Sequence, residues 1–243
     1  MRAHATRRRL PGATTDPQAL TLARPRRSSR VAFFVKKMRT LVKTYDRAYF
    51  DHWYRRQGIG SRTEVSRSAR FVLAATEHLL MRPVRRALDV GCGEGAWRAP
   101  LLAARPGLRY LGVDPSEYAV ARYGRTRNIV RGGIGDLSRL RLRGRVDLVI
   151  CSDVLPYVDD NAISDGLAWI TSHLDGCAYM HAMTTNDAFI GDREHFHDRE
   201  PADYLTMFAD HGLHRVGPHL YAGAMVLPTL CALEGPLPPI VVQ

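Results

Sequence analysis

The chain has 243 residues and a formal net charge of +11 at pH 7, and 45% of its residues are hydrophobic against 24% charged. This length and composition fit one α/β domain with additional segments, in which most of the chain buries a core. No apolar run reaches the ~20 residues that a membrane span needs, and Gly and Pro follow no period. Membrane-spanning and collagen-like proteins are therefore excluded.

The excess positive charge is concentrated in residues 1–37, which hold ten basic residues and one acid. The remaining 206 residues carry a net charge of only +2, which does not indicate a duplex-binding surface. Arg clusters, three prolines and no apolar periodicity predict that residues 1–37 are a disordered basic leader. Three interpretations stay open: a transit peptide, a polyanion-binding arm, or a segment upstream of a translation start at Met38.

The four cysteines show no CxxC spacing and lie in apolar contexts, where a thiol behaves as a small hydrophobe. They are Cys92, Cys151, Cys177 and Cys231. No signal-peptide core is present, and we expect a reduced, cytoplasmic compartment.

From Asp46 onward, aromatic and apolar residues recur at helical spacing, which predicts one helix ended by Gly58 and Gly60 and a second over residues 63–81. Short apolar runs then alternate with helical stretches. The predicted strands are 87–90, 110–113, 128–131, 146–151, 177–183, 215–217 and 225–233, and the predicted helices are 96–104, 117–123, 160–173 and 202–210.

This alternation predicts an α/β fold with a doubly wound, mostly parallel, Rossmann-like seven-stranded sheet. The last two strands would form an antiparallel edge hairpin with its loop at residues 218–223, and Pro228 implies a bulge or an edge position. We expect one domain over residues 38–235, with a helical N-terminal cap at 45–82 and a C-terminal tail at 236–243.

The clearest functional signal lies in residues 87–97, where a buried strand leads into Gly91, Gly93 and Gly95 and then into a helix. Glycine permits a sharp turn and a close approach of backbone to ligand, and a helix N-terminus presents unpaired N–H groups. The pattern predicts a nucleotide-binding loop at the carboxyl end of the first strand.

The acids around this loop distinguish between cofactors. Asp114 ends the next strand, where a carboxylate can accept both hydroxyls of a ribose. Asp89 and Glu94 would repel a pyrophosphate but suit a cofactor that carries an ammonium and a sulfonium. The spacing G-x-G-x-G also differs from the dinucleotide pattern G-x-G-x-x-G, so S-adenosylmethionine is favoured over NAD.

The run Asp89-Val-Gly-Cys-Gly-Glu-Gly95 resembles the first motif of the class I S-adenosylmethionine-dependent methyltransferases. Residues 111–116, 135–137 and 147–158 are similar, in order, to three further motifs of that family. The resemblance implies a methyltransferase (EC 2.1.1.-) with S-adenosyl-L-methionine as cofactor, Asp114 on the ribose and Asp136 at the adenine amino group. The cofactor-binding residues that it implies are Asp89, Gly91, Cys92, Gly93, Glu94, Gly95, Asp114, Pro115, Asp136, Cys151 and Ser152.

The segment 45–54 also resembles the leading helix of small bacterial methyltransferases of unassigned substrate. In that resemblance its aromatic side chains close over the cofactor. The alternative is an amphipathic helix that packs these side chains on the sheet.

The reaction implied is an in-line displacement at the sulfonium methyl, in which a base can remove a proton from the acceptor. One candidate is Asp153 with Ser152 and Tyr157, although Asp153 could instead cap the following helix. The others are Glu194 and His197 in the polar loop 191–199.

Two alternatives stay open for that polar loop. It could be a solvated surface loop, or His195 and His197 could be metal ligands, but no other His completes a site and we predict no metal. His181, near the end of the fifth strand, is a weaker candidate for the base, and the alternative is a histidine that is hydrogen-bonded in the core.

A near-neutral body without a separate recognition domain favours a small-molecule acceptor, no membrane partner, and a monomer or homodimer. Residues 152–157 lack the N/D-P-P-Y/F sequence of amino-methylating nucleic-acid enzymes. Three alternatives remain: a nucleic-acid methyltransferase that uses residues 1–37, an NAD-dependent oxidoreductase, and a cofactor-binding regulatory module without catalysis.

Overall fold

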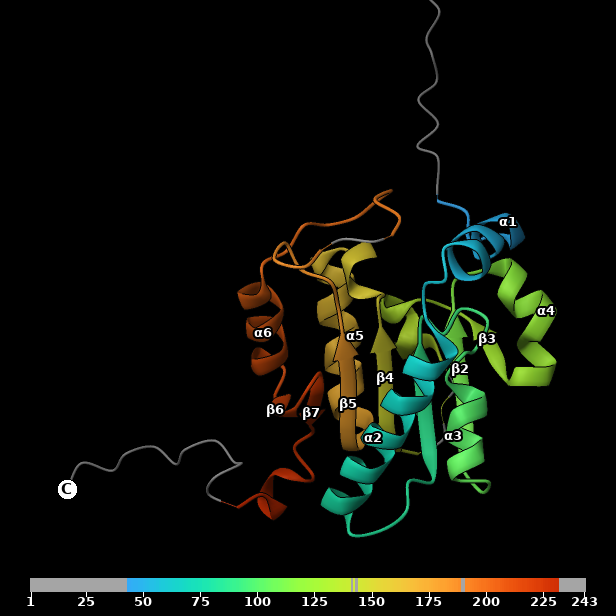
Figure 1. Ribbon diagram of the computed structural model, residues 1–243. Coiled ribbons are helices and arrows are strands. Elements are labelled where there is room, and N and C mark those ends of the chain that lie inside the picture. The colour runs from blue at the N-terminus through green and yellow to red at the C-terminus, as the bar shows by residue number, and fades with distance from the viewer. Residues whose placement is uncertain (1–42, 141, 143, 189–190, 232–243) are drawn as a thin grey trace, which may run out of the picture. The chain divides into compact units, whose positions relative to one another are not determined.

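The computed structural model describes residues 43–140, 142, 144–188 and 191–231. The predicted leader at 1–37 and the predicted tail at 236–243 lie outside the described residues. Seven strands form one sheet in the order β3-β2-β1-β4-β5-β7-β6 (Figure 1). The strands are β1 Arg86–Val90, β2 Arg109–Asp114, β3 Ile129–Arg131, β4 Val146–Ser152, β5 Leu174–His181, β6 His214–Gly217 and β7 Leu220–Ala222.

Strands β1 to β5 pair in parallel, and β7 pairs antiparallel with both β5 and β6. The prediction of a doubly wound, mostly parallel sheet with an antiparallel edge is therefore confirmed. Because the chain crosses from one half of the sheet to the other between β1 and β4, the loops at their carboxyl ends diverge and leave room for a ligand.

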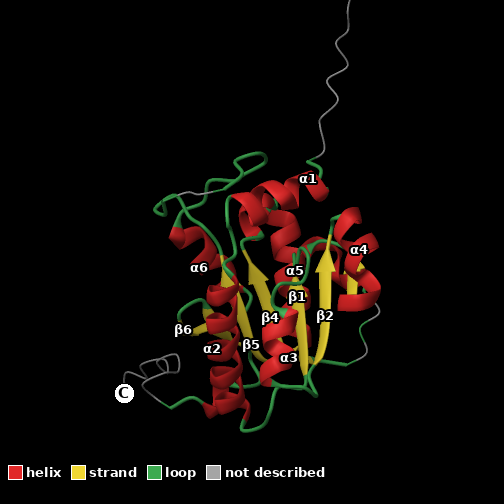
Figure 2. Ribbon diagram, turned by 45° about the vertical axis from the view of Figure 1, so that its right-hand side comes forward, coloured by secondary structure: helices red, strands yellow, loops and turns green. Residues whose placement is uncertain are grey.

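Helices cover both faces of the sheet. The α-helices are α1 Arg47–Phe50, α2 Arg62–Leu80, α3 Arg98–Ala104, α4 Glu117–Arg127, α5 Asp160–His173 and α6 Pro201–Asp210, and the short π or 3₁₀ segments are η1 Asp51–Arg56, η2 Ile134–Arg139, η3 Leu155–Tyr157 and η4 Leu227–Thr229. Figure 2 shows α2 and α3 in front of the strands and α5 behind them. Among the described helices, none is long and apolar enough to cross a bilayer.

Two hydrophobic clusters hold these layers together. On one face, Val72 of α2 and Leu101 of α3 pack against Leu148 of β4. On the other face, Leu167 and Ile170 of α5 pack among residues such as Val149 of β4. The residues of β4 from Val146 to Cys151 are all buried, as expected for a central parallel strand covered on both faces.

The prediction of a strand over residues 225–233 is wrong for 225–231, and residues 232 and 233 lie outside the described residues. The last strand of the described part is the earlier segment Leu220–Ala222, and Pro228 lies in the 3₁₀ turn Leu227–Thr229. Proline cannot donate to a sheet ladder, so apolar side chains around it pack in a turn instead. Gly217 pairs with Leu220, so the hairpin loop is the two-residue segment 218–219 and not 218–223.

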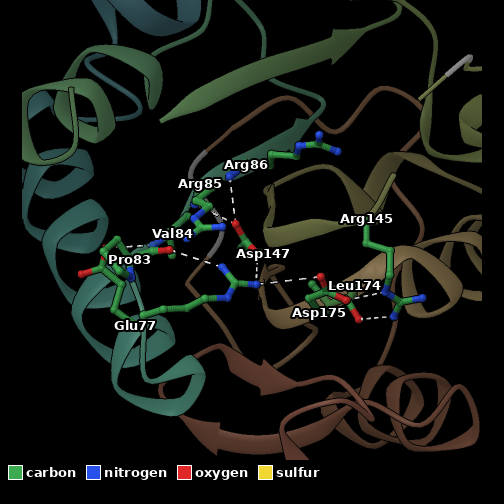
Figure 3. A network of polar contacts seen from close by, with 10 residues as sticks. Glu77, Pro83, Val84, Arg85, Arg86, Arg145, Asp147, Leu174 and Asp175 are labelled. Carbon is green, nitrogen blue, oxygen red and sulfur yellow. Dashed lines mark hydrogen bonds and ion pairs between the residues drawn. The ribbon is translucent and has the colours of Figure 1, made fainter. Parts of the chain in front are cut away.

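The amino ends of the central strands are joined by a polar network (Figure 3). One carboxylate oxygen of Asp147 accepts the backbone N–H groups of Arg85 at 2.7 Å and Arg86 at 3.0 Å. The other accepts a guanidinium N–H of Arg82 at 2.7 Å. Burial opposes ionisation of Asp147, but these hydrogen bonds prevail and lower the pKa of its carboxyl group.

Candidate active site

The glycine loop after β1 folds back across β2. The N–H groups of Gly91 and Cys92 both donate to the carbonyl oxygen of Val113, at 2.8 and 3.1 Å. Gly91 has φ +67°, and a Cβ at this position would lie 2.1 Å from Cγ2 of Val154. Only glycine fits there, because any side chain would meet both the backbone strain and this contact.

Asp114 is held rigidly at the end of β2. Its two carboxylate oxygens accept the N–H groups of Gly93 at 2.6 Å and Ser116 at 2.8 Å. The residue is only 6% exposed, and burial raises the pKa of its carboxyl group. Within the part of the chain that the structure describes, no Lys or Arg forms an ion pair with it.

A cavity of about 210 Å³ lies over the carboxyl ends of β1, β2 and β4. Its floor includes the glycine loop and Asp114, and its roof is aromatic. The lining residues are Tyr45, Tyr49, Phe50, Tyr54, Gly91, Gly93, Asp114, Pro115, Gly133, Ile134, Ser152, Asp153, Val154, Tyr157 and Val158. Of the predicted cofactor-binding residues, Gly91, Gly93, Asp114, Pro115 and Ser152 are among them.

Four aromatic side chains from the segment 45–54 form the roof. Phe50 is buried and lies so close to the glycine loop that a Cβ on Gly93 would be 3.2 Å from its ring. The hydroxyl of Ser116, the N-cap residue of α4, donates to the carbonyl oxygen of Tyr45. These aromatic side chains therefore close over the cavity, and their closure over a cofactor stays a prediction.

Lys43 ties the roof to the loop after β5. Its ammonium group lies 2.7 Å from a carboxylate oxygen of Asp192 and 4.0 Å from the ring centre of Tyr157. The same ammonium donates to the carbonyl oxygen of Glu194 at 2.9 Å. Its side chain is only 6% exposed, so these contacts are shielded from solvent.

Asp89 and Glu94, which were also predicted to bind the cofactor, do not line the cavity. Asp89 accepts the hydroxyl of Tyr110 at 2.6 Å, and burial raises the pKa of its carboxyl group to about 7. Glu94 pairs with Arg55 at 2.7 Å. Neither acid lines the cavity, so both would act on a ligand through the loop or through their charge.

Cys92 and Gly95 in the glycine loop, and Cys151 at the end of β4, likewise do not line the cavity. Burial raises the pKa of both thiols, which makes them packing groups at neutral pH. Gly95 has φ +78°, and a Cβ on it would lie 3.3 Å from Ile129. These three residues therefore contribute to the packing of the glycine loop and not to the lining of the cavity.

At the end of the cavity beyond β3, Gly133 and Ile134 are the lining residues. The carboxylate of Asp136 instead accepts the N–H of Gly133 at 3.0 Å and pairs with Arg139 at 2.7 Å. Sequence reasoning missed Gly133 and Ile134. The signal that could have found them is the position directly after β3, where the parallel strands end together.

Asp153 is the one predicted base that lines the cavity. Its backbone is left-handed, with φ +60°, and its N–H donates to the carbonyl oxygen of His181 at 2.8 Å. Its carboxylate lies 2.8 Å from Nδ1 of His181. The alternative that it caps the next helix does not apply, because Asp159 caps α5.

Glu194 and His197 lie in the loop after β5 but do not line the cavity. The side chain of Glu194 is 55% exposed. His197 lines a separate surface depression with Arg199 beside α6. Among the described residues, no three His, Cys, Asp or Glu side chains are grouped so that they could hold a metal ion.

Comparisons with known proteins agree with this geometry. Residues 88–176 match the model of a family described as a methyltransferase domain. The ribosomal RNA large subunit methyltransferase G of Aeromonas salmonicida (strain A449) is 30% identical over 121 residues, which are 45% of this chain and 30% of that protein. The chain thus matches less than a third of the length of this relative.

Solved structures share the fold. A SAM dependent methyltransferase from Archaeoglobus fulgidus aligns with a TM-score of 0.54 and 21% identity, over 69% of this chain and 74% of that one. Magnesium protoporphyrin IX methyltransferase from Synechocystis PCC 6803 with bound SAH aligns with a TM-score of 0.54 and 20% identity, over 74% of this chain and 96% of that one. DesVI from Streptomyces venezuelae aligns with a TM-score of 0.56 and 16% identity, over 72% of this chain and 96% of that one.

Proposed function

We propose that this chain, whose residues 88–176 are a methyltransferase domain on the class I S-adenosylmethionine-dependent methyltransferase fold, transfers a methyl group from S-adenosyl-L-methionine to a small-molecule acceptor. The observation that carries the proposal is the cavity at the carboxyl ends of β1, β2 and β4. It combines a glycine loop in which Gly91 has no room for a side chain with a buried carboxylate that has no cationic partner among the described residues.

The residues present fit this cofactor. Gly91 and Gly93 bring the backbone within reach of a ligand, and Asp114 offers carboxylate lone pairs to ribose hydroxyls. Gly133 and Ile134 would contact the adenine, and the roof residues Tyr49 and Phe50 would cover the ligand from the other side. Because Asp89 and Asp114 have no basic partner among the residues that the structure describes, the site also suits a ligand with positive charge.

The cofactor would supply an electrophilic methyl group on a sulfonium, which needs little activation. The chain would therefore act mainly by placing the acceptor in line with that methyl group and by excluding water. Ser152 and Asp153 lie at the end of β4, where the cavity meets a second cleft. We assign the methyl end of the cofactor to this junction.

A small-molecule acceptor is supported by the net charge of +2 on residues 38–243 and by the enclosed, aromatic roof of the cavity. A large polyanion would need a basic surface beside the site. The near-neutral body offers no such excess of positive charge.

The direct test is calorimetric titration of the full chain with S-adenosyl-L-methionine, S-adenosyl-L-homocysteine and NADH. We expect micromolar binding of both sulfur compounds and about tenfold or more weaker binding by Asp114→Asn, since hydrogen bonds to a charged group contribute ~1.5–3 kcal/mol. Asp165→Asn, an exposed acid on α5, is the matched control. Binding of NADH alone would overturn the proposal.

A nucleic-acid acceptor is the second candidate, because the curated relative acts on ribosomal RNA by its name and residues 1–37 hold ten basic residues. It predicts RNA binding that weakens steeply with salt. Replacing Arg7, Arg8 and Arg9 with Ser in the full chain should then lower RNA affinity and flatten the salt dependence. Unchanged RNA binding by this variant would remove the candidate.

A further inference from the structure

A second cleft, of about 550 Å³, opens beside the cofactor cavity and shares Ser152 and Asp153 with it. One wall comes from α2, which lies across β4 and β5 (Figure 1). The other wall is the turn between β6 and β7. The lining residues are Gly60, Glu64, Val65, Arg67, Ser68, Phe71, Trp97, Ser152, Asp153, Tyr179, His181, Pro218 and His219.

The polar centre of this cleft is a pair formed by two neighbouring strands. Ser152 and His181 are register partners at the carboxyl ends of β4 and β5. This register places Asp153, the residue after Ser152, beside the imidazole of His181. The carboxylate of Asp153 is 2.8 Å from Nδ1 of His181. The contact has the distance of an ion pair but not the alignment of a hydrogen bond. A carboxylate this close to Nδ1 still favours the proton on Nδ1 and leaves Nε2 as the proton acceptor.

Aromatic groups surround the pair. The ring of His219 lies edge-on to that of His181 with centroids 4.6 Å apart. The ring of Tyr179, two residues before His181 on β5, is parallel to the imidazole with centroids 6.4 Å apart. Phe71 of α2 is 38% exposed at this cleft although it is large and apolar. Flat apolar walls around one imidazole suit a planar ring that carries an ionisable proton.

We propose that His181 is the general base for methyl transfer to an aromatic hydroxyl group bound in this cleft, with Asp153 as its positioning residue. The inference rests on the proposed function and names its acceptor class. A hydroxyl lone pair of the acceptor forms the bond to the methyl carbon. The bond from that carbon to sulfur breaks with its electron pair kept on sulfur, and the hydroxyl proton goes to Nε2 of His181.

The charges around His181 suit this role. The contact with Asp153 raises the pKa of the imidazole, and Asp187 in the loop after β5 acts in the same direction. Burial and the neighbouring His181 lower the pKa of His219. Glu64 and Arg67 complete the charged groups that line the cleft from α2. A base of raised pKa is closer in proton affinity to a phenol than an ordinary histidine is.

The test uses 4-nitrophenol, whose phenolate is yellow and whose neutral form is colourless. The full chain is saturated with S-adenosyl-L-homocysteine and titrated with the phenol below the pKa of free 4-nitrophenol. We expect the bound phenol to turn yellow with the wild type, and the yellow signal to fall at least tenfold with His181→Gln. Because no methyl group is present, this readout is independent of turnover.

The matched control is His173→Gln, a histidine just before the other end of β5, which should keep the yellow signal. Asp153→Asn should lower the pKa of His181 when the imidazole is titrated by NMR, because the negative charge beside the ring is lost. It should also lower the yellow signal of bound 4-nitrophenol, which a purely structural role of the pair in the turn would not require. The affinity for S-adenosyl-L-homocysteine should stay within about twofold in His181→Gln and His173→Gln, because neither side chain lines the cofactor cavity.

Three outcomes would overturn the inference. In the first, His181→Gln forms phenolate as well as the wild type does. In the second, S-adenosyl-L-homocysteine binds but 4-nitrophenol does not, which refutes the acceptor assignment and leaves the proposed function standing. In the third, S-adenosyl-L-homocysteine itself does not bind, which refutes the proposed function first.

Discussion

At the amino end of β4, the buried Asp147 is neutralised within the chain by Arg82 and two backbone N–H groups. At the carboxyl ends of β1 and β2, Asp89 and Asp114 are just as buried, but their partners within the described part of the chain are only a tyrosine hydroxyl and backbone amides. The pKa is lowered for Asp147 and raised for Asp89 and Asp114.

This difference separates a structural end of the sheet from a binding end. At the amino end, hydrogen bonds from Arg82 and the backbone compensate the charge of Asp147, so this carboxylate stabilises the fold without any ligand. The carboxyl end keeps carboxylates whose ionised form is disfavoured by burial, and a bound cation would relieve that cost. The four experiments below test this division.

The largest effect is expected for Gly91→Ala at the binding end. The new Cβ would lie 2.1 Å from Val154, so the loop must move and affinity for S-adenosyl-L-homocysteine should fall about 100-fold, or ~2.7 kcal/mol. Calorimetry measures the loss. Gly107→Ala is the control because nothing lies within 4 Å of a Cβ there. Unchanged affinity would show that the loop does not contact the ligand.

Asp147→Asn should act on stability instead. We expect a loss of about 2 kcal/mol in the free energy of unfolding at pH 7, because a charged acceptor of three donors is removed. Since the folded pKa of Asp147 is lowered, its contribution is present above the unfolded pKa and disappears as pH falls through the folded pKa. Urea denaturation at pH 7 and pH 3 measures both. A change in cofactor affinity without a change in stability would contradict the division.

Asp89→Asn should remove a pH dependence of the opposite sign. The folded pKa of Asp89 is about 7, so folded Asp89 holds a proton that the unfolded chain has lost between about pH 4 and pH 7. Stability of the wild type should therefore fall over this range relative to the variant, by on the order of 1 kcal/mol or more. Denaturation at pH 5 and pH 8 tests this, and equal pH slopes would refute it.

The smallest effect is expected for Arg55→Gln. Glu94 is the acid of the glycine loop that does have a cationic partner, but Arg55 is 45% exposed and Glu94 21% exposed. Partly exposed ion pairs contribute about 0.5 kcal/mol, so the melting temperature should hardly change. A loss as large as that of Asp147→Asn would mean that the carboxyl end also depends on ion pairs for its stability.

Much of the fold was predictable from the sequence because buried parallel strands and amphipathic helices have strong periodic patterns. Helix α5 begins and ends at the predicted residues 160 and 173. The strand at Leu220–Ala222 was not predictable in the same way, because it has three residues and begins after His219, whose backbone has a positive φ. A segment this short has too few residues to show alternation.

The candidate site was predictable where local sequence determines geometry and not where chain segments meet. The glycine loop and Asp114 belong to one strand–turn–helix unit and its neighbour, and both line the cavity. The roof, by contrast, depends on Tyr45 and Phe50 crossing to a loop more than forty residues later in the chain. The contact of Asp153 with His181 depends on the register of β4 against β5, which no single motif encodes.

The junction at Asp153 also bears on how such a protein could be re-engineered. The cofactor cavity is lined by residues from the segments 45–54, 91–93, 114–115, 133–134 and 152–158, whereas the far walls of the second cleft come from 60–71 and 218–219. The complete lining of the cavity and that of the cleft share only Ser152 and Asp153. A combinatorial library confined to α2 and the β6–β7 turn could therefore vary acceptor selectivity while leaving the cofactor-binding half of the protein unaltered.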